Sequence, residues 1–244
     1  MQPQLAISTV IFALRANDEG KRTLMLPLVK RIREPHLGSW ALPGGPLLGA
    51  ESLEDAAARN LRETTGLSSR YLEQLYSFGN PDRSPANSSG GELTGGEATI
   101  DDGVDRRVVS IVYWALVGQD EANRAVESEN VHWFAADCLP DLAFDHNLIV
   151  EYALWRLRAK VNYSRVAHGF LDEEFTLAQL REVYEIVLGK PLDKGNFRRS
   201  VEASGTIVPT GRVVAGGSHR PPALYTYNKT RSLADRGPLN KISQ

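Results

Sequence analysis

The chain has little of what several classes of protein require. It contains one cysteine, Cys138, so it can form neither an internal disulfide nor a zinc site with several cysteines. Its five histidines are scattered, without the close spacing of a metal-binding pair. The apolar stretch 5–14 is far shorter than the roughly 20 residues of a membrane span, and no basic segment of a signal peptide precedes it. These absences predict a cytoplasmic protein with no membrane partner and no metal site of its own.

The charge that is present is unevenly distributed. The formal net charge is only −2, but residues 1–154 carry 13 Lys/Arg against 22 Asp/Glu, whereas residues 155–244 carry 15 against 8. An acidic first part and a basic second part are typical of a sensor joined to a nucleic-acid-binding module. A solvated charged face would give the same counts, so charge alone does not decide the function.

The first part alternates apolar segments with turns. Segments rich in β-branched and aromatic residues predict strands over 5–14, 24–30, 71–78, 107–118 and 130–134. Asp145 is suited to begin a long helix that reaches about Lys160. Residues 81–105 are rich in Gly, Ser, Pro and acidic side chains, so we expect a mobile loop there.

Residues 45–67 read GPLLGAESLEDAAARNLRETTGL. Ser52 is suited to cap a helix, and Gly66 to end it. The segment resembles the Nudix box, whose pattern is G-x5-E-x7-R-E-U-x-E-E-x-G-U with U a bulky aliphatic residue. The positions that match are Gly45, Glu51, Arg59, Leu61, Glu63, Gly66 and Leu67. Asn60 and Thr64 stand where the pattern has acidic residues.

These two departures bear directly on chemistry. Positions 60, 63 and 64 share one helix face, which in the Nudix family presents three carboxylates to divalent cations and to the diphosphate they bridge. Only Glu63 is left here, and the Asn60 amide is too weak a base to activate water. We therefore expect a segment that cradles a diphosphate, binds Mg²⁺ weakly if at all, and has no catalytic residue. Without the joint match, Glu63 would be read as a solvated carboxylate, and Glu51 and Arg59 as an exposed ion pair.

The second part predicts a winged helix-turn-helix over 155–231, followed by a disordered tail over 232–244. Thr176 can cap a helix over 177–188 that Gly189 ends, and Asp193 can cap a second helix over 194–204. Residues 206–210 and 223–227 can pair as the wing. The second helix turns Phe197 and Val201 inward and its basic residues outward, as a recognition helix in a DNA groove does. A solvated basic face on a packing domain, or a protein-binding adapter, would share this pattern.

Taken together, the two parts resemble the NrtR family of Nudix-related transcriptional regulators of NAD metabolism. The resemblance is carried by the altered box, by LAFDH at 142–146, by residues 173–201 and by RPPALY at 220–225. It implies an α/β Nudix fold with a mixed sheet between helices over 1–154, followed by the winged helix. It also implies a homodimeric repressor of NAD biosynthesis or salvage genes that needs no cofactor and that ADP-ribose releases from a double-stranded operator.

The resemblance also assigns residues to two sites. Residues expected to bind or brace the ligand are Arg31, Trp40, Gly44, Gly45, Arg59 and Glu63. Residues expected to contact DNA are Lys194, Asn196, Arg198, Arg199, Arg212 and Arg220, of which Arg199 is placed to read bases and the wing arginines suit phosphates or a minor groove.

Two other functions stay open at this point. The first is an active Nudix hydrolase of ADP-ribose-like compounds with an accessory domain, whose missing carboxylates would come from Glu127, Glu129 or the acidic residues of 101–105. The second is a metabolite-binding adapter that acts on a protein partner.

Overall fold

The computed structural model of the chain describes residues 3–17, 19–69, 71–80, 108–125, 128–161, 165–214 and 221–228. It divides the chain into two compact units, Met1–Trp155 and Arg156–Gln244, each of which is described by itself. The expected loop 81–105, the tail 232–244, Arg220 and Glu127 lie outside the described residues. Within the described part, no helix combines the length and the apolar character that a bilayer crossing requires.

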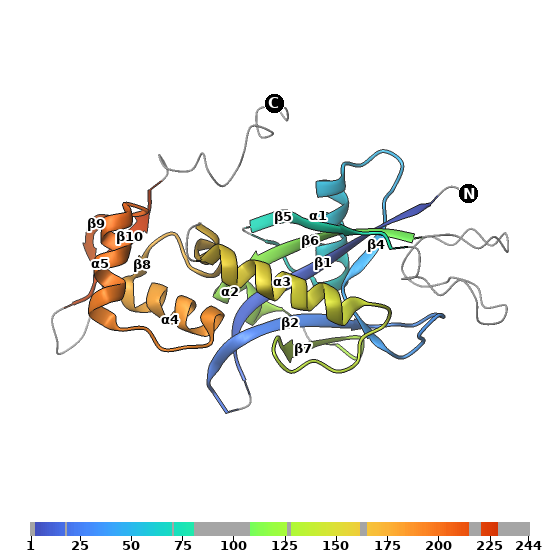
Figure 1. Cartoon of the computed structure of the whole chain (residues 1–244), viewed down its shortest axis with the longest axis horizontal. Coiled ribbons are helices and arrows are strands. Elements are labelled where there is room, and N and C mark those ends of the chain that lie inside the picture. Colours follow the sequence, from blue (N-terminus) through green and yellow to red (C-terminus); the bar gives the residue numbers. More distant parts are fainter. Residues whose placement is uncertain are drawn as a thin grey trace. The chain divides into compact units, whose positions relative to one another are not determined.

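The first unit is built on a mixed seven-stranded sheet (Figure 1). Its main path runs β3-β2-β1-β6-β5, with β4 also paired to β1 and β7 to β2. The pairing of β1 with β6 is parallel, and the other pairings are antiparallel. The strands are β1 (Gln4–Ala16), β2 (Arg22–Lys30), β3 (Trp40–Ala41), β4 (Gly44–Pro46), β5 (Tyr71–Phe78), β6 (Val108–Val117) and β7 (Val131–Ala135).

Two helices, α1 (Leu53–Thr65) and α2 (Gln119–Arg124), and the greater part of a third, α3 (His146–Val161), complete this unit. In Figure 1, α3 crosses the face of the sheet turned toward the viewer, and α1 lies behind the sheet. The α/β fold with a mixed sheet between helices is therefore confirmed. The short elements β3, β4 and α2 were not predicted, because two to six residues carry too little periodicity to be recognised in a sequence.

Strand β1 is buried on both faces because it lies in the middle of the sheet. All residues from Ala6 to Leu14 are buried, which explains the continuous apolar run in the sequence. Ile11 and Ala13 pack in one core cluster with Leu61 of α1, and Ile7 packs in another with Ala56 and Ala57. Alternation along the strand turns the side chains between them toward the face that α3 covers.

The segment that leads into α1 is held by one ion pair. Nε and Nη2 of Arg59 donate to the two carboxylate oxygens of Glu51, at 3.0 and 2.8 Å. The same carboxylate accepts from the backbone N–H of Leu48 at 2.7 Å, and Nη2 of Arg59 also donates to the carbonyl of Pro46. Ser52 caps the helix by accepting from the N–H of Asp55, and Gly66 ends it in the left-handed conformation. Both predicted ends of α1 are confirmed.

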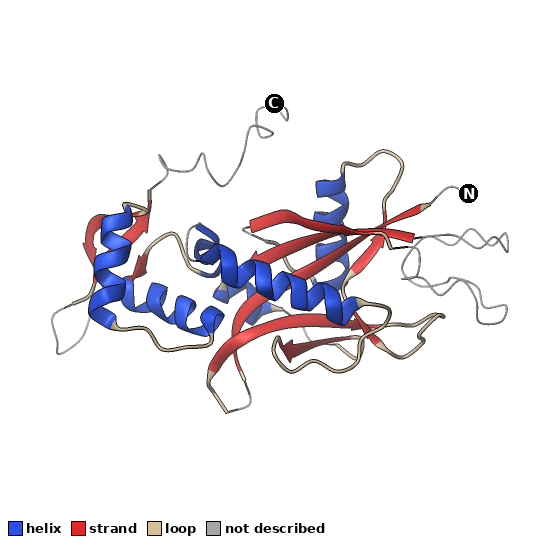
Figure 2. Cartoon of the chain, viewed as in Figure 1, coloured by secondary structure: helices blue, strands red, loops and turns tan. Residues whose placement is uncertain are grey.

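The second unit is a small helical module with a three-stranded sheet, ordered β8-β10-β9. It contains a 3₁₀ helix (Arg165–Phe170), β8 (Phe175–Thr176), α4 (Leu177–Leu188), α5 (Lys194–Ser204), β9 (Ile207–Val213) and β10 (Ala223–Tyr227). Figure 2 shows α4 and α5 as two separate helices joined by a short connection. The predicted helix-turn-helix and the paired wing strands are therefore confirmed. The 3₁₀ helix and β8 were not predicted.

Local hydrogen bonds fix the two helices and the turn between them. Thr176 and Gln179 form a reciprocal capping box at the start of α4. Asp193 caps α5 by accepting from the N–H of Asn196. Glu185 of α4 accepts from the N–H of Leu192 at 2.8 Å and so ties the turn to α4. The start of α5 is thereby fixed relative to α4.

The Glu51–Arg59 pair predicts a specific pH dependence of stability. Its two hydrogen bonds from Arg59 and the Leu48 N–H lower the pKa of Glu51 from 4.5 to about 2. A carboxyl group whose pKa is lower in the folded state stabilises the fold above its unfolded pKa, and this stabilisation is lost as the pH falls toward the folded pKa. We expect Glu51→Gln to lower the thermal unfolding midpoint at pH 7, and the difference from wild type to shrink between pH 4.5 and 2.

The matched control is Glu54→Gln, which removes an exposed carboxylate from the first turn of the same helix. Its midpoint should stay close to that of the wild type at every pH. A constant gap for Glu51→Gln across the whole pH range would contradict the proposed role of this pair.

Candidate functional site

Every N–H donor of Arg59 is engaged within the altered box. Besides its bonds to Glu51 and Pro46, its Nη1 donates to Oδ1 of Asn60 at 3.0 Å and to Oε2 of Glu63 at 3.1 Å. A guanidinium has five such donors, and these contacts use all of them. The surrounding carboxylates raise the pKa of Arg59 above its ordinary value, with Glu51 contributing most. Arg59 therefore braces the segment that leads into α1 and the first half of the helix.

The two glycines before the helix are required by close packing. A Cβ at Gly44 would lie 2.7 Å from the backbone oxygen of Ile7, its neighbour on β1. A Cβ at Gly45 would lie 2.7 Å from Oδ1 of Asn60. The first contact is with the backbone, so another residue at Gly44 would require the backbone to shift, whereas another residue at Gly45 would require the Asn60 side chain to move. The glycines thus bring β4 against β1 and α1, which is a structural reason for them independent of any ligand.

Asn60 and Thr64 do not present their oxygens as the acids of an intact box would. Asn60 is 3% exposed, its Oδ1 accepts from Arg59, and its Nδ2 is buried without a hydrogen-bond partner. The Thr64 hydroxyl donates to the backbone oxygen of Asn60 at 2.5 Å. Of the three predicted positions, only Glu63 offers a carboxylate, and its side chain is 62% exposed.

This donor set does not fit a Nudix magnesium cluster. Mg²⁺ is held by hard oxygens, usually from carboxylates and substrate phosphates in near-octahedral geometry, and here the one carboxylate is already paired with Arg59. In the described part of the chain, no three His, Cys, Asp or Glu side chains are grouped so that they could hold a metal ion. Glu129 is described and belongs to no such group, and Glu127 and residues 101–105 lie outside the described residues.

Arg31 and Trp40 belong to a second group of side chains. The Trp40 ring packs edge-on against His132 and Phe134 of β7, with centroids 5.3 and 5.2 Å apart. The Arg31 guanidinium lies 4.6 Å from the centroid of Phe144, and its Nε donates to the backbone oxygen of Pro35. Because Trp40, Phe134 and Phe144 are only half-buried, their rings form a partly accessible aromatic surface.

Two residues of this second group were missed in the sequence. Phe144 and His36 both have positive φ, 57° and 67°, and their rings meet edge-on at 4.7 Å. Left-handed backbone is costly for a residue with a side chain, and such residues gather at functional sites. The segment LAFDH marked this region in the sequence without giving Phe144 a role. Nothing in the sequence indicated His36.

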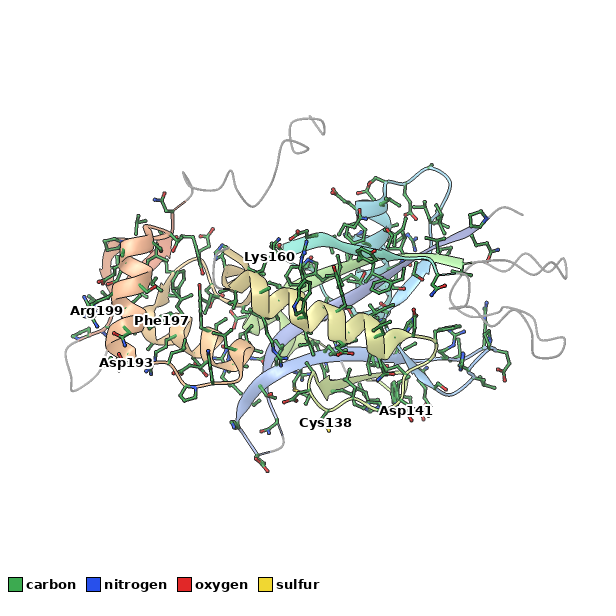
Figure 3. All side chains as sticks on the ribbon, viewed as in Figure 1. Cys138, Asp141, Lys160, Asp193, Phe197 and Arg199 are labelled. Atoms are coloured by element: carbon green, nitrogen blue, oxygen red, sulfur yellow. The ribbon has the colours of Figure 1, made fainter. Side chains whose placement is uncertain are left out.

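On the second unit, the predicted DNA-contacting residues of α5 are exposed together. Phe197 and Val201 are buried, whereas Lys194, Asn196, Arg198 and Arg199 are exposed. Figure 3 shows Arg199 on the outer side of α5, opposite Phe197, with Asp193 at the start of the helix. The Tyr184 ring of α4 packs edge-on against Phe197 at 5.2 Å, and burial raises the pKa of its hydroxyl.

The three described arginines of this surface differ in their partners. Arg198 forms an ion pair with Glu202 at 3.0 Å, and Arg212 of β9 is paired with Glu174. Arg199 instead donates to the amide oxygen of Asn196, at 2.5 Å. A neutral partner orients the Arg199 guanidinium but leaves its charge uncompensated. This makes Arg199 the arginine best suited to a base edge.

Comparison with known proteins agrees with this two-part construction. Residues 6–152 match the model of the NUDIX domain, and residues 167–227 match that of the NrtR DNA-binding winged helix domain. An "ADP-ribose pyrophosphatase" of Methanocaldococcus jannaschii is 31% identical over 130 residues, which cover 53% of this chain and 66% of that protein.

Three further matches extend over both parts. The crystal structure of Shewanella oneidensis NrtR has a TM-score of 0.73 at 33% identity, over 92% of this chain and 94% of that one. The structure of the same protein complexed with a 27mer DNA has a TM-score of 0.70 at 32% identity, over 92% of this chain and 93% of that one. The "ADPR responsive transcriptional repressor NtrR" of Acinetobacter baylyi is 33% identical over 226 residues, 91% of this chain and 82% of the repressor. The chain therefore belongs to the NrtR family of Nudix-related transcriptional regulators.

Proposed function

We propose that this chain is a DNA-binding transcriptional repressor whose Nudix domain binds ADP-ribose without rapidly hydrolysing it. The observation that carries the proposal is the combination of an exposed recognition helix with a Nudix box whose acidic face is reduced to Glu63. The Acinetobacter relative, described as responsive to ADP-ribose, supports the choice of ligand. The Shewanella structure with DNA supports the choice of partner. Genes of NAD biosynthesis or salvage are the expected targets, as the family resemblance implies.

The two groups of side chains suggest how the Nudix domain binds its ligand. The backbone around Gly44 and Gly45 and the Glu63 end of α1 are assigned to the diphosphate. The half-buried rings of Trp40 and Phe144, with Arg31 against the latter, suit an adenine base, because ligand sites combine aromatic walls with a few placed polar groups. Arg59 is assigned a bracing role, since all its donors are already used.

The winged helix is proposed to act in pairs. One α5 spans a few base pairs, and helix-turn-helix regulators read two half-sites about one helical turn apart as dimers. A homodimer on a pseudo-palindromic operator follows. ADP-ribose releases the operator if it binds better to the conformations of the dimer in which the two α5 helices do not match the half-sites.

The proposed DNA binding and its response to ADP-ribose are tested together by fluorescence anisotropy with duplex DNA from upstream of the chain's own gene. We expect binding that weakens steeply with salt, because Lys and Arg side chains displace counterions from phosphates. ADP-ribose should raise the dissociation constant by about 5- to 150-fold, the usual range of allosteric coupling. AMP and nicotinamide mononucleotide serve as control ligands and should leave it unchanged. Absence of salt-sensitive binding would instead favour the adapter function.

Base reading by Arg199 is tested by substitution. Arg199→Ala should cost about 1–3 kcal/mol of operator affinity and relax the preference for one base pair, because it removes a side chain that can bond two acceptors on guanine. Arg198→Ala should cost less, since its charge is already balanced by Glu202. Arg62→Ala, at an exposed position of α1, is the control and should bind like the wild type. Unchanged affinity of both α5 variants would exclude this helix as the reader.

The rival function, hydrolysis, has a specific observation in its favour, namely the match to an ADP-ribose pyrophosphatase over 130 residues. We expect the wild type to release AMP from ADP-ribose with Mg²⁺ slowly, because no carboxylate base stands at position 60. The double variant Asn60→Glu/Thr64→Glu, which completes the box, should raise the rate by on the order of 10²-fold or more.

The control for this experiment is Glu63→Gln in the background of the double variant, which should abolish the gain. Rapid release of AMP by the wild type, lost on Glu63→Gln alone, would show that the chain is an active hydrolase and would overturn the proposed loss of activity.

A further inference from the structure

The outermost line of α5 carries one long side chain. Gly195, Arg199 and Ala203 are spaced as i, i+4 and i+8, so they lie in one line along the helix, and all three are exposed. This line is turned away from the buried Phe197 and Val201, as Figure 3 shows for Arg199. Small residues before and after Arg199 allow the helix backbone to come close to the floor of a groove. Arg199 is therefore the side chain of this line that can reach a base edge.

Gly195 is not required by packing within the second unit. Among the described residues, the nearest atom that a Cβ at this position would meet is Oδ1 of Asp193, at 3.5 Å, which is ordinary van der Waals contact. The residue lies inside α5, where glycine is less favourable than every residue except proline. A glycine that its own fold does not require, one turn before Arg199, indicates close approach of another molecule to this turn.

Asn196 holds the Arg199 guanidinium by its amide oxygen. Nη2 of Arg199 and Oδ1 of Asn196 are 2.5 Å apart. A guanidinium only donates hydrogen bonds, so the amide atom that faces it must be the oxygen and not the nitrogen. The backbone N–H of Asn196 in turn donates to the capping carboxylate of Asp193 at 2.8 Å. The cap of α5 thus fixes Asn196, and Asn196 fixes Arg199.

An asparagine whose oxygen is engaged in this way cannot read adenine. The bidentate contact of asparagine with adenine needs the oxygen to accept from N6 while the nitrogen donates to N7. Arg199 keeps the donors that guanine requires, since Asn196 uses one of its five N–H groups and guanine accepts two at N7 and O6. The two side chains are therefore suited to different tasks.

We propose that Asn196 is a positioning residue, which holds Arg199 in the orientation that reads one guanine and which reads no base itself. The inference rests on the proposed function, because it requires that α5 enter the major groove. A guanidinium that is already held has less rotamer freedom to lose on binding than a free one. An amide partner also leaves the positive charge of Arg199 intact, whereas the charges of Arg198 and Glu202 offset each other.

The test begins with the duplex that the full wild-type chain selects from a pool of random duplexes. Fluorescence anisotropy gives its affinity, and the affinities of duplexes in which one base pair at a time is changed. The guanine in question is the position at which Arg199→Ala no longer distinguishes G·C from A·T. In the wild type, this change of base pair should weaken binding by about tenfold or more.

Asn196→Ala should reduce this discrimination by about threefold to tenfold, because the guanidinium is no longer held, and should leave discrimination at every other base pair unchanged. In the Arg199→Ala background the same substitution should change the affinity by less than about twofold, since Asn196 acts only through Arg199. Asn123→Ala, at an exposed asparagine of α2, is the matched control and should bind like the wild type.

The conservative variant Asn196→Asp separates positioning from base contact. A carboxylate still accepts from Arg199 but has no N–H to offer a base, so discrimination at the guanine should stay within about threefold of the wild type. Binding to all duplexes should weaken alike, because the added negative charge is repelled by the phosphates.

Three results would overturn the inference. The first is an Asn196→Ala variant that discriminates at the guanine as the wild type does. The second is a loss of discrimination at a separate A·T pair, which would show that Asn196 reads adenine. The third is an equal effect of Asn196→Ala in the wild-type and Arg199→Ala backgrounds. Selective DNA binding persists in all three, so the proposed function would stand, whereas a chain that selects no duplex would overturn both.

Discussion

The Arg59 guanidinium holds the altered Nudix box together. Its five donors join two acceptors in the preceding segment, Glu51 and Pro46, to two on the helix itself, Asn60 and Glu63. The shape of the segment therefore depends on a charged network in which every donor of Arg59 has a partner. An amide oxygen at Asn60 accepts one of these bonds as a carboxylate would. The framework of the family can thus persist after the acidic face has been lost.

The absence of acidic residues at positions 60 and 64 changes the electrostatics of this helix face more than it changes the shape of the segment. A face with three carboxylates repels a diphosphate unless divalent cations neutralise it, whereas a face with one carboxylate, already paired with Arg59, does not need them to the same extent. In a regulator this has an advantage, because a sensor that cleaved its ligand would lower the signal it measures. The proposed function unites the two halves of the chain on this physical ground.

The second unit is organised by local signals. The ends of α4 and α5 are set by capping residues, namely Thr176 with Gln179, Gly189, Asp193 and Gly205. These caps can be recognised in the sequence because capping depends on neighbouring residues alone. The side chains that pair with the arginines are harder to predict from the sequence. The pair of Arg198 with Glu202 follows helical spacing, but the pairing of Arg212 with Glu174 joins residues far apart along the chain. Only the folded module distinguishes Arg199 by its neutral partner.

The sequence by itself determined the two-part construction, the long strands and both helices of the helix-turn-helix. It also indicated the altered box, because periodicity, caps and motif spacing are properties of neighbouring residues. Tertiary structure decided that all five donors of Arg59 are engaged within the box, and that a side chain at Gly45 would meet Oδ1 of Asn60. It also brought His36 onto Phe144, and Tyr76 onto Tyr152 of α3. These contacts join distant parts of the chain, so their geometry exists only after the sheet has formed.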